Sequence, residues 1–191
     1  MYTPLIYQMS NHDCGPTGVI NGLRQLFERK EIPPEMLKMI YATCMNEHSA
    51  DGRPCRGTDL HAMRFLSVQL NEYAPLVNFP LETEFLCHEQ VHLDKDSPII
   101  RWVNDGGVAV MRIFVGVGHY ALCTKITDTD VYLWDPYLEE MPKLPDVSYH
   151  LENKRDYNLI VSRSRFEQYG HEMFMLSDNE HRNVLLMRRK K

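Results

Sequence analysis

Apolar positions recur with a helical period through the first third of the chain. The spacing i, i+1, i+4, i+7 and i+8 predicts a helix over 15–30. Its apolar face holds Val19, Ile20, Leu23, Leu26 and Phe27. Pro16 suits the first turn because the N–H it lacks would have no partner there. Two more helices are predicted, one that opens at residues 33–34 and one that Thr58 caps and that runs to about residue 70.

Farther along the chain, short apolar runs end in turn residues, which is typical of strands. The predicted strands cover 99–103, 108–117, 119–126, 131–134, 157–162 and 183–187. Turn-forming residues at 104–107 and 127–129 separate neighbouring strands, so these strands should form antiparallel pairs. Residues 138–156 have the pattern of a polar connection, and Ser164 to Glu167 has the spacing of a capping box for a short helix.

Helices therefore fill the N-terminal half and an antiparallel sheet fills the C-terminal half, which is an α+β pattern. The composition, with 43% hydrophobic and 25% charged residues, is ordinary for a globular protein. A chain of this length can bury a hydrophobic core without disulfides or a structural metal. We expect a single domain over 1–191, with the helical half packed on the sheet and a cleft where the halves meet.

Charge and cysteine content narrow the class of protein. A net charge of −5 does not favour a nucleic-acid partner, and the basic run at 188–191 fits a solvated tail. Five cysteines without regular spacing argue against a disulfide framework. No apolar stretch approaches the roughly 20 residues that span a bilayer, and no signal peptide is visible. We expect a cytoplasmic protein without membrane insertion; export through a signal outside this numbering stays open.

Cys14 is the first candidate for chemistry. A cysteine attacks as its thiolate, and the N-terminal end of a helix stabilises that negative charge. The predicted helix starts beside Cys14, and the polar residues 11–13 before it argue for an exposed sulfur. The alternative is a buried cysteine that serves as a small hydrophobic side chain, which is the common case.

His119 and Asp135 are predicted to meet across a hairpin. His119 starts one strand and Asp135 ends the next, and the short turn between these strands makes them antiparallel neighbours. A histidine can exchange a proton with a thiol, and a carboxylate can accept from Nδ1–H so that Nε2 faces the sulfur. A core histidine bonded to a backbone carbonyl is the alternative for His119.

Gln8 lies six residues before Cys14, on an extended lead-in to the helix. Its side-chain amide can donate to an oxyanion, with the backbone N–H of Cys14 as the second donor. A solvated loop residue is the alternative for Gln8 considered by itself.

These residues stand in motifs that resemble a known family. Gln8-x5-Cys14-Gly15-Pro16-Thr17, then Gly118-His119-Tyr120, then Trp134-Asp135-Pro136-Tyr137 are similar to the bacteriocin-processing (double-glycine leader) peptidase-like family, in a stand-alone form. The resemblance implies a papain-like fold with its active site in the cleft and hydrolysis of a peptide or protein substrate through a thioester. It assigns Cys14 as nucleophile, His119 as base and acid, Asp135 as the residue that orients His119, and Gln8 as oxyanion donor. We expect no cofactor.

The alternative functions involve either the same residues or a different group of residues. An acyl or peptidyl transferase would share the whole site, and a non-catalytic papain-like module would bind peptides without reaction. A zinc site could involve Cys87, His88 and His92, or Cys55 and His61, but no paired Cys-x2-Cys spacing supports it. We therefore expect no metal, and oligomeric state is not predicted.

Overall fold

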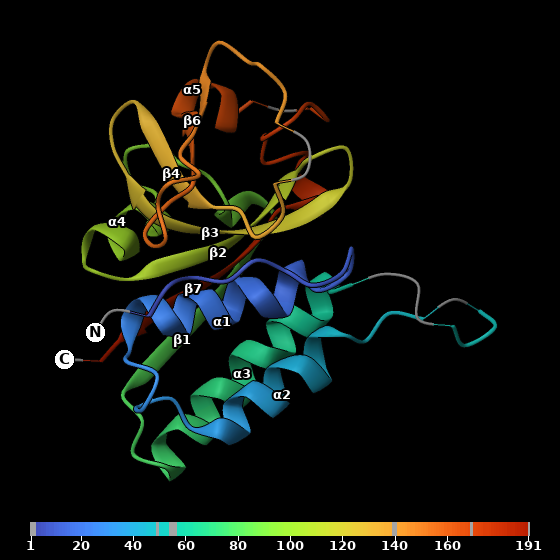
Figure 1. Cartoon of the computed structure of the whole chain (residues 1–191), viewed down its shortest axis with the longest axis vertical. Coiled ribbons are helices and arrows are strands. Elements are labelled where there is room, and N and C mark those ends of the chain that lie inside the picture. Colours follow the sequence, from blue (N-terminus) through green and yellow to red (C-terminus); the bar gives the residue numbers. More distant parts are fainter. Residues whose placement is uncertain (1–2, 49, 54–56, 139–140, 169, 191) are drawn as a thin grey trace.

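Helices pack on one antiparallel sheet in the computed structural model, which describes residues 3–48, 50–53, 57–138, 141–168 and 170–190 (Figure 1). The helices are α1 (Cys14–Leu26), α2 (Pro34–Cys44), α3 (Leu60–Leu76), α4 (Pro98–Asn104) and α5 (Arg163–Phe166), with 3-10 turns η1 (His88–Gln90) and η2 (Asn179–His181). The strands are β1 (Leu81–Cys87), β2 (Val108–Phe114), β3 (Gly118–Ile126), β4 (Asp130–Trp134), β5 (Val147–Tyr149), β6 (Leu159–Ser162) and β7 (Asn183–Arg189). The predicted α+β class is confirmed.

The sheet contains 7 strands in the order β1-β7-β2-β3-β4-β6-β5, and every pairing is antiparallel. The last strand, β7, lies between β1 and β2 and so joins the strand that follows the first three helices to the β2–β3 hairpin. The central β3 pairs with both β2 and β4. This order places the start of β3 and the end of β4 on neighbouring strands.

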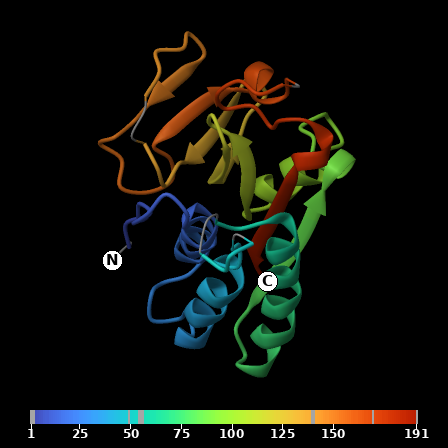
Figure 2. The same cartoon turned by 90° about the vertical axis from the view of Figure 1, so that its right-hand side faces the viewer.

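Alternate residues of the central strands enter two separate cores, because successive side chains of a strand point to opposite faces. Val110 and Leu122 pack with the core that α1, α2 and α3 cover. Their neighbours Met111 and Ala121 pack with the core that contains side chains of α4 and α5. The sheet therefore has helices on both faces, and the layer of α1–α3 is seen beside it in Figure 2.

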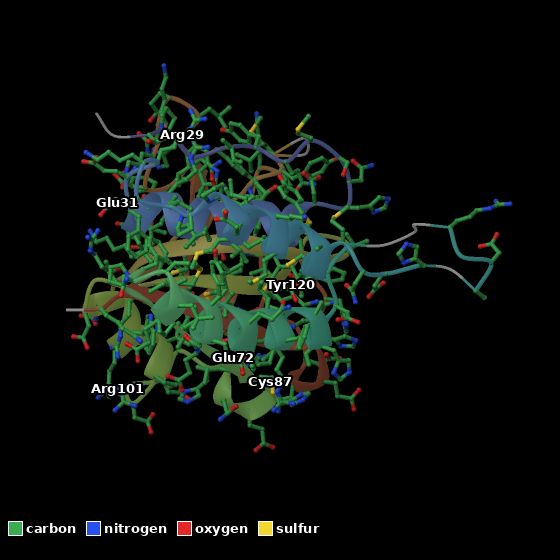
Figure 3. All side chains as sticks on the ribbon, turned by 90° about the horizontal axis from the view of Figure 1, so that it is seen from below. Arg29, Glu31, Glu72, Cys87, Arg101 and Tyr120 are labelled. Carbon is green, nitrogen blue, oxygen red and sulfur yellow. The ribbon has the colours of Figure 1, made fainter. Side chains whose placement is uncertain are left out.

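The helix α1 lies close against the sheet, in contact with β2, β3 and β7. Gly22 allows this approach, since a Cβ atom there would lie 2.8 Å from the sulfur of Met187 on β7. The first turn of α1 thereby comes near the start of β3. Tyr120 of β3 is buried in the core under α1–α3, where Figure 3 labels it.

The strand predicted over 99–103 is wrong, because this segment is the helix α4. Ser97 caps it by accepting hydrogen bonds from the backbone N–H groups of Ile99 and Ile100, and Pro98 occupies its first turn. The buried residues 99, 102 and 103 have helical spacing, but a short run of apolar residues does not by itself distinguish a helix from a strand. The turn predicted at 104–107 ends this helix, and Gly106 has a φ of 89° there.

Other boundaries also differ from the sequence prediction. The prediction assigned no strand to β1, and β5 lies inside the segment interpreted as a polar connection. Asp59 caps α3 in place of Thr58, and Ser162 caps α5 in place of Ser164. The hydroxyl of Thr58 donates to the carbonyl of Cys44 instead. In the part of the chain that the structure describes, no helix combines the length and apolar character that a bilayer span requires.

Candidate active site

Cys14 is the first residue of α1, where the backbone N–H groups of the first turn have no intrahelical acceptor. The chain is tightly packed there, since a Cβ at Gly15 would lie 2.0 Å from the hydroxyl oxygen of Thr58. Cys14 is only 9% exposed, so the expectation of an openly accessible sulfur is wrong. Of the polar residues before it, Asp13 is buried, whereas Asn11 and His12 are exposed.

Asp13 is the buried residue that holds this otherwise exposed segment in a turn. Its carboxylate accepts hydrogen bonds from the backbone N–H groups of Met9 and Ser10, at 2.9 and 2.8 Å, and from the Ser10 hydroxyl at 2.7 Å. Burial raises the pKa of Asp13, but these donors outweigh burial and hold the pKa below its ordinary value. Asp13 thus stays ionised and fixes the loop from Gln8 to Cys14, a role that the sequence analysis did not assign.

His119 and Asp135 are in contact, as their positions on the predicted antiparallel strands require. His119 Nε2 lies 2.7 Å from Asp135 Oδ1, and the two side chains belong to residues that are 4% and 1% exposed. The register of β3 with β4 pairs Leu122 with Trp134, so His119 and Asp135 lie just beyond this pair on neighbouring segments. The predicted contact between His119 and Asp135 is confirmed.

The ring nitrogen that meets the carboxylate is not the predicted one. The hairpin pattern predicts Nδ1 as the partner of Asp135, whereas Nε2 makes that bond. Interaction with the His119 ring also lowers the pKa of the Cys14 thiol, and because Nε2 is bound to Asp135, Nδ1 is the nitrogen left for the sulfur. Residue spacing does not encode which ring nitrogen faces the carboxylate.

Cys14 and His119 shift each other's protonation. Burial raises the pKa of Cys14, but the hydrogen bond and charge of His119, with the backbone N–H groups of Tyr120 and Gly15, bring the pKa below its ordinary value. Burial lowers the pKa of His119, but the charge and hydrogen bond of Asp135 and the interaction with Cys14 raise it to about 10. At neutral pH these shifts favour a thiolate beside an imidazolium.

The side chain of Asn158 holds Asp135 in place by hydrogen bonds to the Asp135 backbone. The Asn158 side chain accepts from the Asp135 N–H at 2.7 Å and donates to the Asp135 carbonyl at 2.8 Å. Asn158 is fully buried, and its own N–H donates to Leu133. Asp135 Oδ1 also accepts from the backbone N–H of Tyr137. Nothing in the sequence singled out Asn158, because it lies 23 residues after its partner.

Gln8 lies beside the same carboxyl-terminal end of β4. Its backbone N–H donates to Pro136 at 2.9 Å, and its side-chain Nε2 donates to the Ser10 carbonyl at 2.6 Å. A primary amide has a second N–H, so one donor of Gln8 remains for a bound ligand. Gln8 Oε1 is buried and has no hydrogen-bond partner among the described residues.

The lead-in that carries Gln8 is fastened to both α1 and the sheet. The buried Asn21 of α1 accepts from the N–H of Ile6 and donates to its carbonyl, both at 2.8 Å. The indole N–H of Trp134 donates to the same carbonyl at 3.1 Å, and its ring packs against Tyr7. These contacts fix the position of Gln8 relative to Cys14 and Asp135.

A hollow of about 390 Å³ adjoins this group of residues. It is lined by Tyr7, Gln8, Met9, Ser10, Asn11, Pro136, Tyr137, Leu138 and Leu151. Met9 is 95% exposed and Tyr7 and Leu151 are also exposed, so its rim is rich in apolar surface. This hollow lies between the lead-in and the segment after Asp135.

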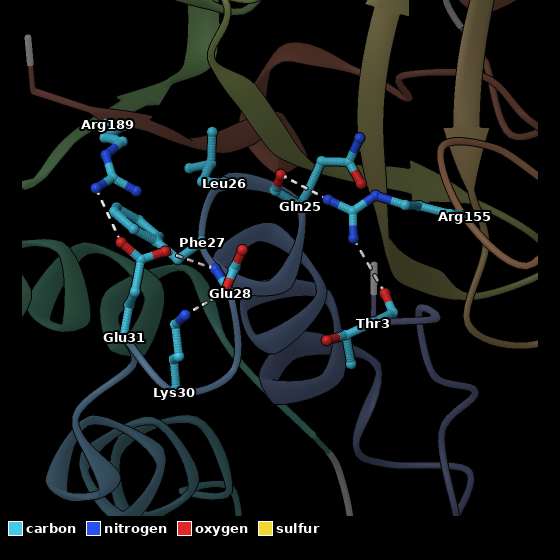
Figure 4. Close-up of a pocket in the computed structure, with 9 residues that line it drawn as sticks. All are labelled: Thr3, Gln25, Leu26, Phe27, Glu28, Lys30, Glu31, Arg155 and Arg189. Atoms are coloured by element: carbon cyan, nitrogen blue, oxygen red, sulfur yellow. Dashed lines mark hydrogen bonds and ion pairs between the residues drawn. The ribbon is translucent and has the colours of Figure 1, made fainter. Parts of the chain in front are cut away.

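A second hollow of about 660 Å³ lies around the C-terminal end of α1, away from Cys14 (Figure 4). Its charged residues bind one another: Arg189 pairs with Glu31 at 2.9 Å, and Lys30 pairs with Glu28 at 3.0 Å. Arg155 donates to the backbone carbonyls of Thr3 and Gln25. These contacts join the lead-in, α1 and β7 around the hollow.

The other described cysteines have different surroundings. Cys44 and Cys123 are fully buried, and burial raises the pKa of each to about 12. Cys87 is partly exposed at the end of β1. Cys55 lies outside the described residues. Of the possible zinc ligands, His88 instead contacts the Asn179 carbonyl and His92 contacts Asp94.

A comparison with models of protein families finds no match to the chain, and a comparison with curated proteins finds none either. The candidate site consequently rests on the structure itself. It has a thiol at a helix start, a histidine bound to a buried carboxylate whose interaction with the thiol lowers the thiol pKa, and an amide on the adjoining lead-in.

Proposed function

We propose that this protein is a papain-like cysteine hydrolase, similar to stand-alone bacteriocin-processing peptidases, that cleaves a peptide or amide bond through a thioester on Cys14. The observation that carries the proposal is the position of the His119 ring. Its Nε2 lies 2.7 Å from Asp135 Oδ1, and interaction with the same ring lowers the pKa of the Cys14 thiol. This order of thiol, imidazole and carboxylate is the arrangement that activates a nucleophilic cysteine.

The shifted pKa values supply a nucleophile before substrate arrives. The lowered pKa of Cys14 and the raised pKa of His119 favour a resting pair of thiolate and imidazolium. The thiolate attacks the carbonyl carbon of the substrate, and a carbon–sulfur bond forms while the carbonyl oxygen becomes an oxyanion. His119 then gives its proton to the leaving amine as the carbon–nitrogen bond breaks, which leaves a thioester on Cys14.

The oxyanion has two candidate donors. The backbone N–H of Cys14 lies in the first turn of α1, which has no intrahelical acceptor, and Gln8 retains one N–H of its side-chain amide. Donors that are already oriented cost little reorganisation when charge develops, so they stabilise the transition state more than the ground state. The bonds of the lead-in to Asn21 and Trp134 support this orientation.

Water completes the cycle. The neutral imidazole that acylation leaves behind removes a proton from water, and the resulting hydroxide equivalent attacks the thioester carbon. The carbon–sulfur bond breaks, the product leaves as a carboxylic acid, and the thiolate–imidazolium pair is restored. The hollow beside Gln8 and Tyr137 offers apolar surface for the substrate chain, in the cleft that we propose beside the site.

The test uses a peptide mixture that covers many residue pairs, incubated with the full chain in water enriched in ¹⁸O. We expect new peptide C-termini that carry ¹⁸O, because water resolves the thioester. Cys14→Ala should abolish them, and Cys87→Ala, a matched change of a cysteine on β1, should retain them.

Two results would argue against the proposal. New termini that persist in Cys14→Ala would assign the cleavage to another nucleophile, and no new termini from the whole mixture would exclude a general peptidase. Peptides joined to an added amine without ¹⁸O would instead identify transfer in place of hydrolysis.

A further inference from the structure

A second group of chemically active side chains lies outside the candidate active site, on the segment between α5 and β7. His171, Asp178 and His181 place one nitrogen or oxygen atom each within 4.8 Å of the others. His181 Nδ1 hydrogen-bonds Asp178 Oδ1, and His171 Nε2 lies 3.8 Å from Asp178 Oδ2. All three are at least partly exposed, so solvent ions reach them.

The segment that carries these residues is anchored between His171 and Asp178. Phe114, at the end of β2, accepts from the N–H of Phe174 at 2.7 Å and donates to the carbonyl of Met175 at 2.9 Å. The N–H of Leu176 donates to Phe166 of α5, and residues 174–176 are buried. The His171 ring packs edge-on against Phe114 at 5.2 Å. This fixed backbone between His171 and Asp178 reduces the ordering that a ligand would require.

The backbone conformation brings the donor atoms together. Asp178 precedes η2 and His181 ends it, so the two side chains are three residues apart on one tight turn. Ser177, directly before Asp178, has a φ of 70°, and Phe174 has a φ of 65°. Residues other than glycine rarely adopt these left-handed backbone conformations. Each such conformation costs free energy that the surrounding contacts must offset.

We propose that His171, Asp178 and His181 bind a divalent transition-metal ion, with zinc as the best fit. Two imidazoles and one carboxylate suit zinc and its neighbours rather than magnesium or calcium, which favour all-oxygen sites. Bond lengths near ~2.0–2.2 Å bring tetrahedral ligands to roughly 3.3 Å from one another, so the group closes by small side-chain movements. Water would complete the coordination.

The site also has a connection to the strand that carries His119. The carbonyl of His181 accepts from Arg112 Nη1 at 3.2 Å. The same guanidinium packs over Gly118, where a Cβ would lie 2.0 Å from Arg112 Nη2. Gly118 immediately precedes His119 on β3. A metal ion at this place would therefore tie the 170–182 segment to the β2–β3 end, and the inference does not depend on the proposed function.

The test titrates metal-free full chain, made without a histidine tag, with zinc and with cobalt(II) alone. The Cys14→Ala background is used because the candidate nucleophile could itself bind metal. We expect one zinc per chain, a higher melting temperature with zinc, and cobalt absorption without a sulfur charge-transfer band. His171→Ala, Asp178→Asn and His181→Ala should each weaken binding by at least about tenfold.

His150→Gln is the matched control, since His150 pairs with the single carboxylate of Glu152 at 3.4 Å. It should leave the affinity unchanged. No stoichiometric binding, or binding that survives all three ligand changes, would overturn the inference and leave a hydrogen-bonded His–Asp–His group only. A sulfur charge-transfer band would also overturn it, because the bound metal would then be on cysteine.

Discussion

His119 Nε2 and Asp135 Oδ1 lie 2.7 Å apart inside the protein, although the two residues are separated by 16 positions. The β3–β4 hairpin brings them together, and Asp135 reaches the histidine with an oxygen that also accepts from the backbone N–H of Tyr137. A buried carboxylate in this position orients the ring and stabilises its positive charge. The opposite ring nitrogen is thereby available to Cys14.

Replacing Asp135 tests this orientation. Asp135→Asn should keep the fold, because the amide oxygen still accepts from Nε2–H, but turnover should fall by on the order of 10²–10⁴ as the charge that supports the imidazolium is lost. Asp135→Ala should lower turnover further and reduce stability, since it leaves a buried ring N–H without an acceptor. Steady-state rates on a working substrate measure both effects. Asp128→Asn, in the exposed hairpin turn, should behave like wild type; equal activity in all three variants would remove Asp135 from the site.

Asn158 is expected to act through Asp135. In Asn158→Ala the buried N–H and carbonyl of Asp135 lose their partners, which should cost about 1–3 kcal/mol for each unpaired group and lower kcat more than it changes KM. Urea unfolding and initial rates would be compared with Asn153→Ala, whose side chain makes one bond to the Tyr157 carbonyl. Two variants that matched in both stability and kcat would contradict a positioning role for Asn158.

Asp13 gives a prediction for stability against pH. Its pKa in the folded chain is lowered, so its contribution is present above the unfolded pKa of about 3.9 and is lost as pH falls through the folded value. Asp13→Asn should therefore destabilise the protein by about 1–3 kcal/mol at neutral pH, and the difference from wild type should shrink in acid. Denaturant melts at neutral and acidic pH would show this, with Asp96→Asn on an exposed turn as control. A difference that did not change with pH would mean that the Asp13 charge contributes nothing.

The pH dependence of kcat/KM follows from the two shifted groups. Activity requires Cys14 ionised and His119 protonated, so it should rise through the lowered pKa of Cys14 and fall through the raised pKa of His119, near 10. Loss of the Asp135 charge in Asp135→Asn should move the alkaline limb to lower pH. An alkaline limb that stays fixed in this variant would show that Asp135 does not set the protonation of His119.

The parts of the site that sequence predicts are those set by local rules. The start of α1 at Cys14 and the meeting of His119 with Asp135 follow from helix and hairpin patterns. The choice of Nε2 for Asp135 and the role of Asn158 depend on tertiary contacts between segments far apart in the chain. Local spacing contains no information about either, and the same limit explains why the burial of Cys14 was missed.

The secondary-structure predictions also divide into elements set by local sequence and elements set by tertiary contacts. The β3–β4 hairpin has a clear turn and apolar runs, and it forms as predicted. In α4, two adjacent isoleucines suggested a strand, but the cap from Ser97 and the first-turn Pro98 make the segment helical. The strand β1 pairs with β7, which lies about a hundred residues later in the chain, so local sequence contains no sign of its partner. Tertiary pairing decides such segments more than local preference does.

The most direct test of the central claim is the alkylation rate of each cysteine, because it needs no substrate. At about pH 6 a free thiol is almost fully protonated, so iodoacetamide should label Cys14 before the other cysteines if it is held as a thiolate by His119. Cys44 and Cys123 should react slowly, since both are buried and have pKa values raised to about 12. The rate at each site is read by mass spectrometry of tryptic peptides.

Two variants, His119→Ala and His119→Gln, complete this measurement and guard against a folding defect in either one. Each should slow labelling of Cys14 by on the order of 10²-fold at about pH 6, and far less at about pH 9, where ordinary thiols ionise without help. That result would establish the thiolate–imidazolium pair in the resting protein. If Cys14 labels no faster than Cys87, and loss of His119 leaves its rate at about pH 6 unchanged, the pair does not exist and the proposed catalytic site is wrong.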